Sequence, residues 1–99
     1  MMNVISLKKI KEFVKKYAGS KAPLLSWYHE VSSAVWKNPQ DIKNRYPSAS
    51  FLEGNIVIFN IKGNRYRLVT KISYMYKTVL IKWIGTHARY DKKDFKGGK

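Results

Sequence analysis

The sequence contains no cysteine, few acidic residues and no long apolar run. Without cysteine the chain forms neither disulfides nor thiolate metal sites. With only six Asp plus Glu and two His, ligands for a closed zinc site are scarce, so we expect neither a metal nor another cofactor. No apolar segment approaches the ~20 residues that a membrane span needs, so we expect a cytoplasmic protein without a membrane partner.

Basic residues dominate the charge of the chain. Twenty Lys plus Arg against six acidic residues give a formal net charge of +14 in 99 residues. Such a field attracts polyanions through steering and counterion release. Nucleic acid is therefore the first partner to expect, and an acidic protein that covers the same surface is compatible with it.

Apolar residues recur at helical spacing in the first forty residues. After a short strand over 3–6, the pattern predicts a helix that Ser6 caps and Gly19 ends, and a second helix that runs from about residue 20 until Pro39 stops it. The side chains expected to pack inward are those of Leu7, Ile10, Val14, Tyr17, Leu24, Trp27, Tyr28, Val31, Val35 and Trp36. Residues 39–47 are expected to hold one helical turn, and residues 48–55 to be a polar connection.

From residue 56 onward the apolar residues follow the period of β-strands. We expect strands over 56–61, 66–74 and 78–84. Within 66–74, Arg67 and Lys71 alternate with apolar residues, so the cations lie on one face of the sheet; the segment 78–84 follows the same rule, with Lys82 between Leu80 and Ile84. The expected fold class is α+β, with two N-terminal helices packed on one face of a mostly antiparallel sheet and the other face free. Residues 1–99 form one domain in this interpretation, with 96–99 as a frayed tail.

Cations and titratable side chains gather between residues 62 and 91. Cleavage of RNA without a metal requires a base for the 2′-hydroxyl, cations for the phosphorane and an acid for the leaving 5′-oxygen. Arg67 offers a planar fork for phosphate, and histidine, here His87, is the residue type that titrates near neutrality. If Thr86 caps a short helical turn, Tyr90 shares a face with His87 and can stack on a base or donate a proton. The catalytic candidates are Arg67, His87 and Tyr90, and the RNA-binding candidates are Lys62, Arg65, Lys71, Lys82 and Arg89.

Each candidate also has a structural interpretation. A histidine just after a strand can cap or pack, and Tyr90 can be part of the structure. Asp91 can orient His87 through its second ring nitrogen, or pair with Lys92 or Arg89 as an exposed ion pair. The lysines of the first helix form either a solvated face or a contact to RNA or the ribosome.

Two segments of the chain carry a family resemblance. They read Gly-Asn-x-x-Arg-Leu at 63–68 and Gly-Thr-His-x-x-Tyr-Asp at 85–91. In this order and at this spacing they resemble the HigB family of bacterial toxins, messenger-RNA interferases of the RelE-like superfamily, and the resemblance is most specific over 56–95.

The resemblance implies a ribonuclease that enters the ribosomal A site and cuts messenger RNA during translation. It also implies a HigA-like antitoxin with a helix-turn-helix domain, so that DNA is bound only through the complex. Arg67 then matches a phosphate-contacting arginine, and the region of His87 and Tyr90 matches the position of the acid or base. A carboxylate base is expected only if Glu53 reaches the site from its loop.

Two classes of function stay open at this point. The first is the endoribonuclease, and the second is a basic binding module, either a non-catalytic RNA binder or a gyrase-inhibiting toxin of a related branch. Binding alone needs the cations but has no use for a titrating pair. The pair His87 and Tyr90 near Arg67 therefore favours the endoribonuclease.

Overall fold

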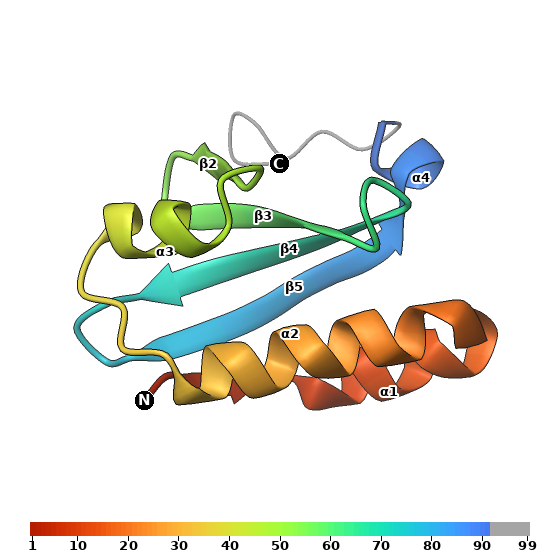
Figure 1. The fold of residues 1–99 in the computed structure, drawn as a ribbon, viewed down its shortest axis with the longest axis horizontal. Coiled ribbons are helices and arrows are strands. Elements are labelled where there is room, and N and C mark those ends of the chain that lie inside the picture. Colours follow the sequence, from red (N-terminus) through yellow and green to blue (C-terminus); the bar gives the residue numbers. More distant parts are fainter. Residues whose placement is uncertain (92–99) are drawn as a thin grey trace.

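The computed structural model describes residues 1–91, in which helices cover one face of a five-stranded sheet (Figure 1). The strand order is β1-β5-β4-β3-β2; β1 runs parallel to β5, and the other neighbouring pairs are antiparallel. The α+β class expected from the sequence is confirmed. The elements in chain order are β1 (Asn3–Ile5), α1 (Leu7–Lys16), the 3₁₀ turn η1 (Ala18–Ser20), α2 (Lys21–Ser33), α3 (Pro39–Arg45), β2 (Ser50–Leu52), β3 (Ile56–Ile61), β4 (Tyr66–Ser73), β5 (Thr78–Thr86) and α4 (His87–Asp91).

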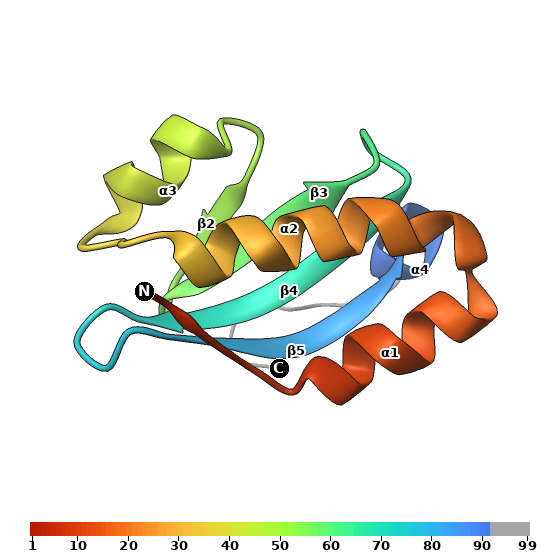
Figure 2. The same cartoon turned by 60° about the horizontal axis from the view of Figure 1, so that its bottom comes forward.

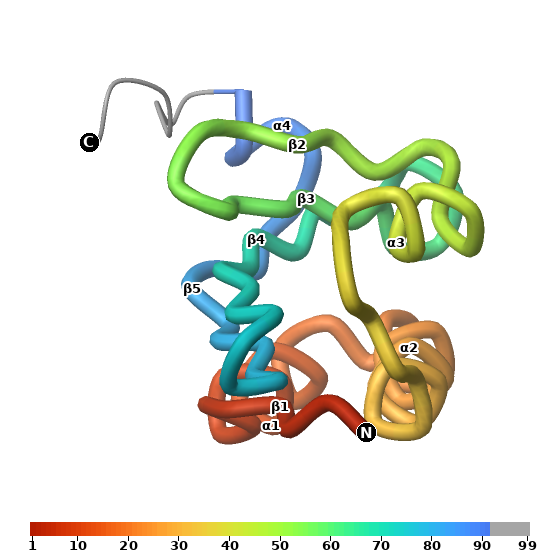
Figure 3. Tube along the Cα trace, turned by 90° about the vertical axis from the view of Figure 1, so that its left-hand side faces the viewer, coloured from red at the N-terminus to blue at the C-terminus, as the bar shows by residue number. Residues whose placement is uncertain are grey.

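The apolar core lies between the sheet and the helices. Figure 2 shows α2 running across the sheet, and Figure 3, an end-on view, places α2 and α3 on the same side of it. Leu24 and Val31 of α2, Ile42 of α3 and Leu68 of β4 are completely buried. Replacing one such leucine or isoleucine with alanine costs about 2–5 kcal/mol of stability, so this face holds the fold together. Within residues 1–91, no helix has the length and apolar character of a membrane span.

The first helix begins where the sequence predicted but ends earlier. Ser6 is the single residue between β1 and α1, and it turns the chain with a φ of 75°; within the described residues its side chain makes no capping hydrogen bond. The helix ends at Lys16, before Gly19, because the chain tightens into η1, where the Ser20 hydroxyl donates to the Tyr17 carbonyl at 2.6 Å. The start of the helix after Ser6 was therefore predicted correctly, although Ser6 makes no side-chain cap within the described residues, whereas the predicted end at Gly19 was wrong.

The second helix is shorter than expected. It stops at Ser33, because Ala34 is extended and its carbonyl accepts a hydrogen bond from the Met2 amide at 3.1 Å. Val35 is consequently 53% exposed and not in the core. Trp36 is buried, as expected, and stacks on Phe59 with 6.2 Å between ring centroids.

The polar connection expected over 48–55 contains a strand instead. β2 pairs with the start of β3, Phe51 packs against the core, and positive φ angles at Gly54 and Asn55 make the turn between the two strands. A strand of three residues is too short to show the alternation of apolar and polar residues that identifies a strand in the sequence. The residues at 39–47, expected to form one turn, form the helix α3.

A β-bulge in β5 determines what the open face of the sheet carries. Val69 pairs with Trp83 and Thr70 with Ile81, which leaves Lys82 as the extra residue. The bulge reverses the alternation, so Ile84, opposite Leu68, packs against the core, and Trp83 lies on the other face. The simple alternation expected for 78–84 therefore holds only up to Lys82.

Candidate functional site

Arg67 lies on the face of the sheet that the long helices leave open. The residues opposite it in register are Asn60 on β3 and Gly85 on β5, so it occupies a central position on the sheet. One terminal nitrogen donates to Oδ1 of Asn64 at 3.3 Å. Its Nε is buried and, among residues 1–91, has no hydrogen-bond partner. The Nε–H of Arg67 is therefore a hydrogen-bond donor without an acceptor among the described residues.

An aromatic cluster stands over the Arg67 guanidinium. Its Cζ lies 4.8 Å from the centroid of the Tyr90 ring, which is within the range of a cation–π contact. The Tyr90 ring in turn lies 6.2 Å from that of Trp83, with the two planes at 47°. Two of the three residues predicted to be catalytic, Arg67 and Tyr90, are thus in direct contact.

The helix α4 carries His87 and Tyr90 at the end of β5 (Figure 1). The Arg89 amide donates to Oγ1 of Thr86 at 3.2 Å, so Thr86 caps this turn as the sequence predicted. The His87 amide donates to the Arg65 carbonyl at 3.0 Å. The start of α4 is therefore fixed to the β3–β4 turn, next to the start of the strand that carries Arg67.

His87 makes its side-chain contact with Asp91. Nδ1 of the imidazole lies 3.2 Å from Oδ2 of Asp91, one helical turn further on. This is the orienting arrangement that the sequence suggested for Asp91, and the alternative partner Lys92 lies outside the described residues. An acceptor at Nδ1 leaves Nε2 as the nitrogen that can exchange a proton. The His87 side chain is about one-third exposed, at 37%, so it is partly open to solvent.

Trp83 is a site residue that sequence reasoning missed. A β-carbon on Gly85 would lie only 2.3 Å from the Trp83 ring, so the ring lies against a position where only glycine leaves room. The ring could take this place because the bulge turns Trp83 onto the open face. The spacing Trp-x-Gly was the available signal, but it has meaning only once the bulge is known.

The other predicted cations are distributed unevenly. Lys71 is exposed on the same face of β4 as Arg67, and Lys82 is exposed in the bulge. Arg65 lies in the turn that receives the His87 amide, and Arg89 is exposed on α4. Lys62 differs from these: its ammonium lies 3.3 Å from where a β-carbon on Gly19 would be, which places it beside η1.

No carboxylate neutralises the Arg67 charge within residues 1–91. Glu53 lies in the turn before β3. Two residues further along, the Asn55 carbonyl accepts a hydrogen bond from the Ile72 amide at 2.9 Å. Ile72 is five residues along β4 from Arg67, or roughly 16 Å at the rise of a strand. Glu53 is therefore remote from Arg67. The same part of the chain contains no cluster of three or more His, Cys, Asp or Glu that could hold a metal ion.

Comparison with known proteins gives the family. Residues 20–93 match the profile of the HigB toxin family, described as the RelE-like toxic component of a toxin–antitoxin system. The chain belongs to the HigB toxin family. The match covers α2, α3 and the strands β2 to β5, so the resemblance based on the two motifs is confirmed over a longer stretch.

Individual members of the HigB family are similar at modest identity. The mRNA interferase toxin HigB of Escherichia coli is 28% identical over 93 residues, which cover 91% of this chain and 88% of the relative. The mRNA interferase HigB of Shigella flexneri matches to the same extent. An mRNA interferase HigB of another Escherichia coli strain is 25% identical over 93 residues, covering 92% of this chain and 90% of the relative.

Proposed function

We propose that this member of the HigB family is an endoribonuclease that cleaves messenger RNA with its own side chains. The observation that carries the proposal is Arg67: within residues 1–91 its Nε–H has no hydrogen-bond partner and no carboxylate neutralises its charge. The Arg67 side chain is only partly buried, and a phosphate oxygen is the acceptor that a guanidinium fork fits best. The names of the relatives, mRNA interferases, support the same substrate.

The proposed reaction is an in-line transfer within the RNA. The 2′-hydroxyl loses its proton and its oxygen attacks the adjacent phosphorus; the bond to the 5′-oxygen breaks, and that oxygen receives a proton. The products are a 2′,3′-cyclic phosphate and a 5′-hydroxyl. Arg67 stabilises the extra negative charge of the phosphorane, and His87 transfers a proton through Nε2 while Asp91 holds Nδ1.

Tyr90 has two possible tasks in this reaction, and its contact with Arg67 suits both. Its ring packs on the guanidinium and so holds the fork in place. Its hydroxyl can then donate a proton, or its ring can stack on a base. Lys71, Lys82, Arg65 and Arg89 extend the positive charge around this centre and bind the RNA backbone. Lys62, beside η1, contributes at the margin.

The partners follow from the family and the charge. A toxin of a toxin–antitoxin system has an antitoxin, and we infer a HigA-like protein with a helix-turn-helix domain that inhibits this chain and provides the contact to DNA. The +14 charge suits both an acidic antitoxin surface and the RNA of the ribosomal A site. Action on translated messages places the protein in the cytoplasm.

The test is a reconstituted translation reaction in which the ends of a defined transcript are mapped. We expect cuts within the reading frame that carry a 2′,3′-cyclic phosphate and that require ribosomes. In a second arm, the ribosome-bound complexes are purified and crosslinked before EDTA removes free divalent ions. The cuts should persist in this arm. Cuts on RNA without ribosomes would mean that the protein recognises RNA directly and does not depend on the ribosome. Intact transcript in every arm would leave the basic binding module as the function and contradict the proposal.

A further inference from the structure

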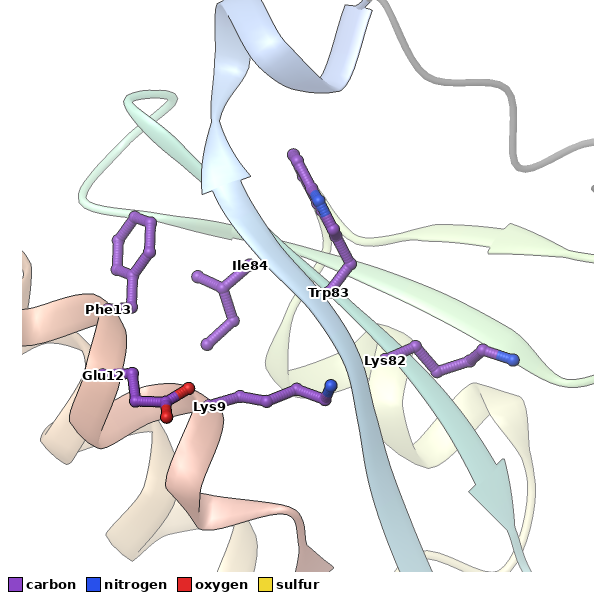
Figure 4. A pocket seen from close by; sticks show the side chains of 6 residues that line it. All are labelled: Lys9, Glu12, Phe13, Lys82, Trp83 and Ile84. Atoms are coloured by element: carbon purple, nitrogen blue, oxygen red, sulfur yellow. The ribbon is translucent and has the colours of Figure 1, made fainter.

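A groove of about 290 Å³ lies between α1 and β5, next to the Arg67 centre but separate from it (Figure 4). β1 pairs with β5 only as far as Leu80, and beyond this point α1 lies alongside the edge of β5. The bulge at Lys82 widens the strand at the same place. The side chains that line the groove are Lys9, Glu12 and Phe13 of α1 and Lys82, Trp83 and Ile84 of β5.

The lining combines two kinds of surface. Lys9 and Lys82 provide two ammonium groups, and Figure 4 shows the Lys9 side chain extending from α1 toward β5. Phe13, Trp83 and Ile84 provide aromatic and apolar surface between them. Cations that flank an aromatic surface are the combination that single-stranded nucleic acid uses, because phosphates bind the cations and bases stack on rings.

Trp83 joins the groove to the Arg67 centre. Trp83 lines the groove, and its ring, which Figure 4 shows on the opposite side of β5 from Phe13 and Ile84, contacts Tyr90, which lies on Arg67. A strand of RNA with its reacting phosphate at Arg67 would pass Tyr90 and Trp83 before it reached Lys82 and Lys9. The groove is therefore placed along the path of the substrate.

We propose that this groove is a second RNA subsite, which binds a nucleotide beside the cleaved bond through phosphate contacts to Lys9 and Lys82 and base contact with Trp83. The subsite rests on the proposed function in that its ligand is the RNA substrate. It gives one lysine of α1 a specific task, and leaves its neighbour Lys8, which does not line the groove, without one.

Glu12 is the acidic residue in the lining, and it makes the subsite testable in both directions. Its carboxylate lies 4.0 Å from the Lys8 ammonium, and both side chains are largely exposed, so the pair only weakly reduces the carboxylate's charge. A carboxylate in a phosphate-binding groove weakens binding. Removing its charge should therefore strengthen the binding of RNA, opposite to the effect of removing Lys9.

The experiment measures the affinity of the full chain for a mixed-sequence 2′-O-methyl RNA decamer, which binds but cannot be cut. Lys9→Ala and Lys82→Ala should each weaken binding roughly 3- to 10-fold at fixed salt, and Glu12→Gln should strengthen it about 2-fold or more. The matched control is Lys8→Ala, which removes the same charge from the adjacent position of α1 and should change the affinity by less than about 2-fold. RNA should also quench the tryptophan fluorescence of the wild type more than that of Trp83→Phe.

Equal effects of Lys8→Ala and Lys9→Ala would overturn the subsite, because they would show that RNA affinity depends on the overall positive charge and not on the position of the lysine. An acidic peptide that depends on Lys9 while RNA does not would also overturn it, and would assign the groove to a protein partner. Circular dichroism of each variant checks the fold. Since the RNA cannot be cut, a wild type that lacks ribonuclease activity would contradict the proposed function without affecting this measurement, so the two failures are distinguishable.

Discussion

Two arginine–tyrosine pairs in this molecule have the same contact and different surroundings. In the first, between α2 and α3, the Arg45 guanidinium lies 5.4 Å from the Tyr46 ring, and both side chains bond to the carboxylate of Glu30. In the second, on the open face, Arg67 lies 4.8 Å from the Tyr90 ring, and its hydrogen-bond acceptor is the neutral amide of Asn64.

The difference lies in what neutralises the cation. Glu30 satisfies Arg45 and accepts the Tyr46 phenol, so the first pair is complete and fastens α3 to α2. Burial, followed by the hydrogen bond to Glu30, raises the pKa of Tyr46 well above its ordinary value of 10.0. Arg67 keeps its full charge and an unpartnered Nε–H within residues 1–91, so the second pair is prepared for an anion. The same two residue types thus serve structure in one place and, in our proposal, chemistry in the other.

The largest effect is expected at His87, which the account makes a proton-transfer residue of the open-face site. His87→Ala should lower cleavage about 10²- to 10⁴-fold without loss of the fold. His87→Gln should not restore the rate, because an amide forms hydrogen bonds but transfers no proton near neutral pH. Single-turnover cleavage of the mapped transcript measures this, and a wild-type rate for His87→Ala would return the histidine to a capping role.

Arg67→Lys tests whether the shape of the cation matters as well as its charge. A lysine keeps the charge but loses the planar fork, so cleavage should fall roughly 10²-fold while the melting temperature changes little. The matched variant Arg45→Lys at the structural pair should leave cleavage unchanged. If Arg67→Lys cuts RNA at the wild-type rate, point charge is sufficient and the fork has no catalytic use.

Asn64→Asp should make the second pair resemble the first. The near-isosteric carboxylate would accept from Arg67 as Glu30 does from Arg45, and would neutralise the charge that phosphate needs. Cleavage should fall about 10-fold through weaker stabilisation of the phosphorane, with stability equal or higher. Comparing cleavage rates and urea unfolding for this single variant measures both; unchanged cleavage would show that neutralising Arg67 is harmless.

The smallest effect is a pH dependence of stability at the structural pair. Because folding raises the pKa of Tyr46, its contribution is present below the ordinary pKa of 10.0 and is lost as the pH rises through the folded value. The pKa of Tyr74, raised by burial and then by Asp41, acts in the same direction.

Tyr46→Phe should therefore lose about 1–2 kcal/mol near neutral pH and show a smaller further loss in alkaline solution than the wild type. Urea unfolding at neutral and alkaline pH measures both quantities. Parallel losses in wild type and variant would remove Tyr46 from the alkaline transition.

Much of this arrangement was accessible from the sequence. The alternation of Arg67 and Lys71 with buried residues gave the correct face of β4, and the Thr86 cap gave the start of α4. These features are local, since a period or a cap depends on neighbouring residues. The β2 strand, the parallel pairing of β1 with β5 and the position of Trp83 depend on contacts between distant segments, which a local pattern does not contain.

The bulge shows why the site was only partly predictable. Lys82 as an extra residue reverses which side chains of β5 face outward, and one unpaired position has no signature in a strand of nine residues. Arg67 and Tyr90 could be chosen by type and spacing, but the tryptophan beside them could not. The tasks of the predicted site residues remain predictions for the experiments above.

The most direct test of the account measures Arg67→Ala and Arg45→Ala side by side for RNA cleavage and for stability. Arg67→Ala should lose cleavage about 10²-fold or more and keep its unfolding midpoint, whereas Arg45→Ala should keep cleavage and lose about 1–2 kcal/mol of stability by leaving Glu30 without its cation. If instead both variants cut RNA at the wild-type rate, the open face is not the reaction centre and the account is contradicted.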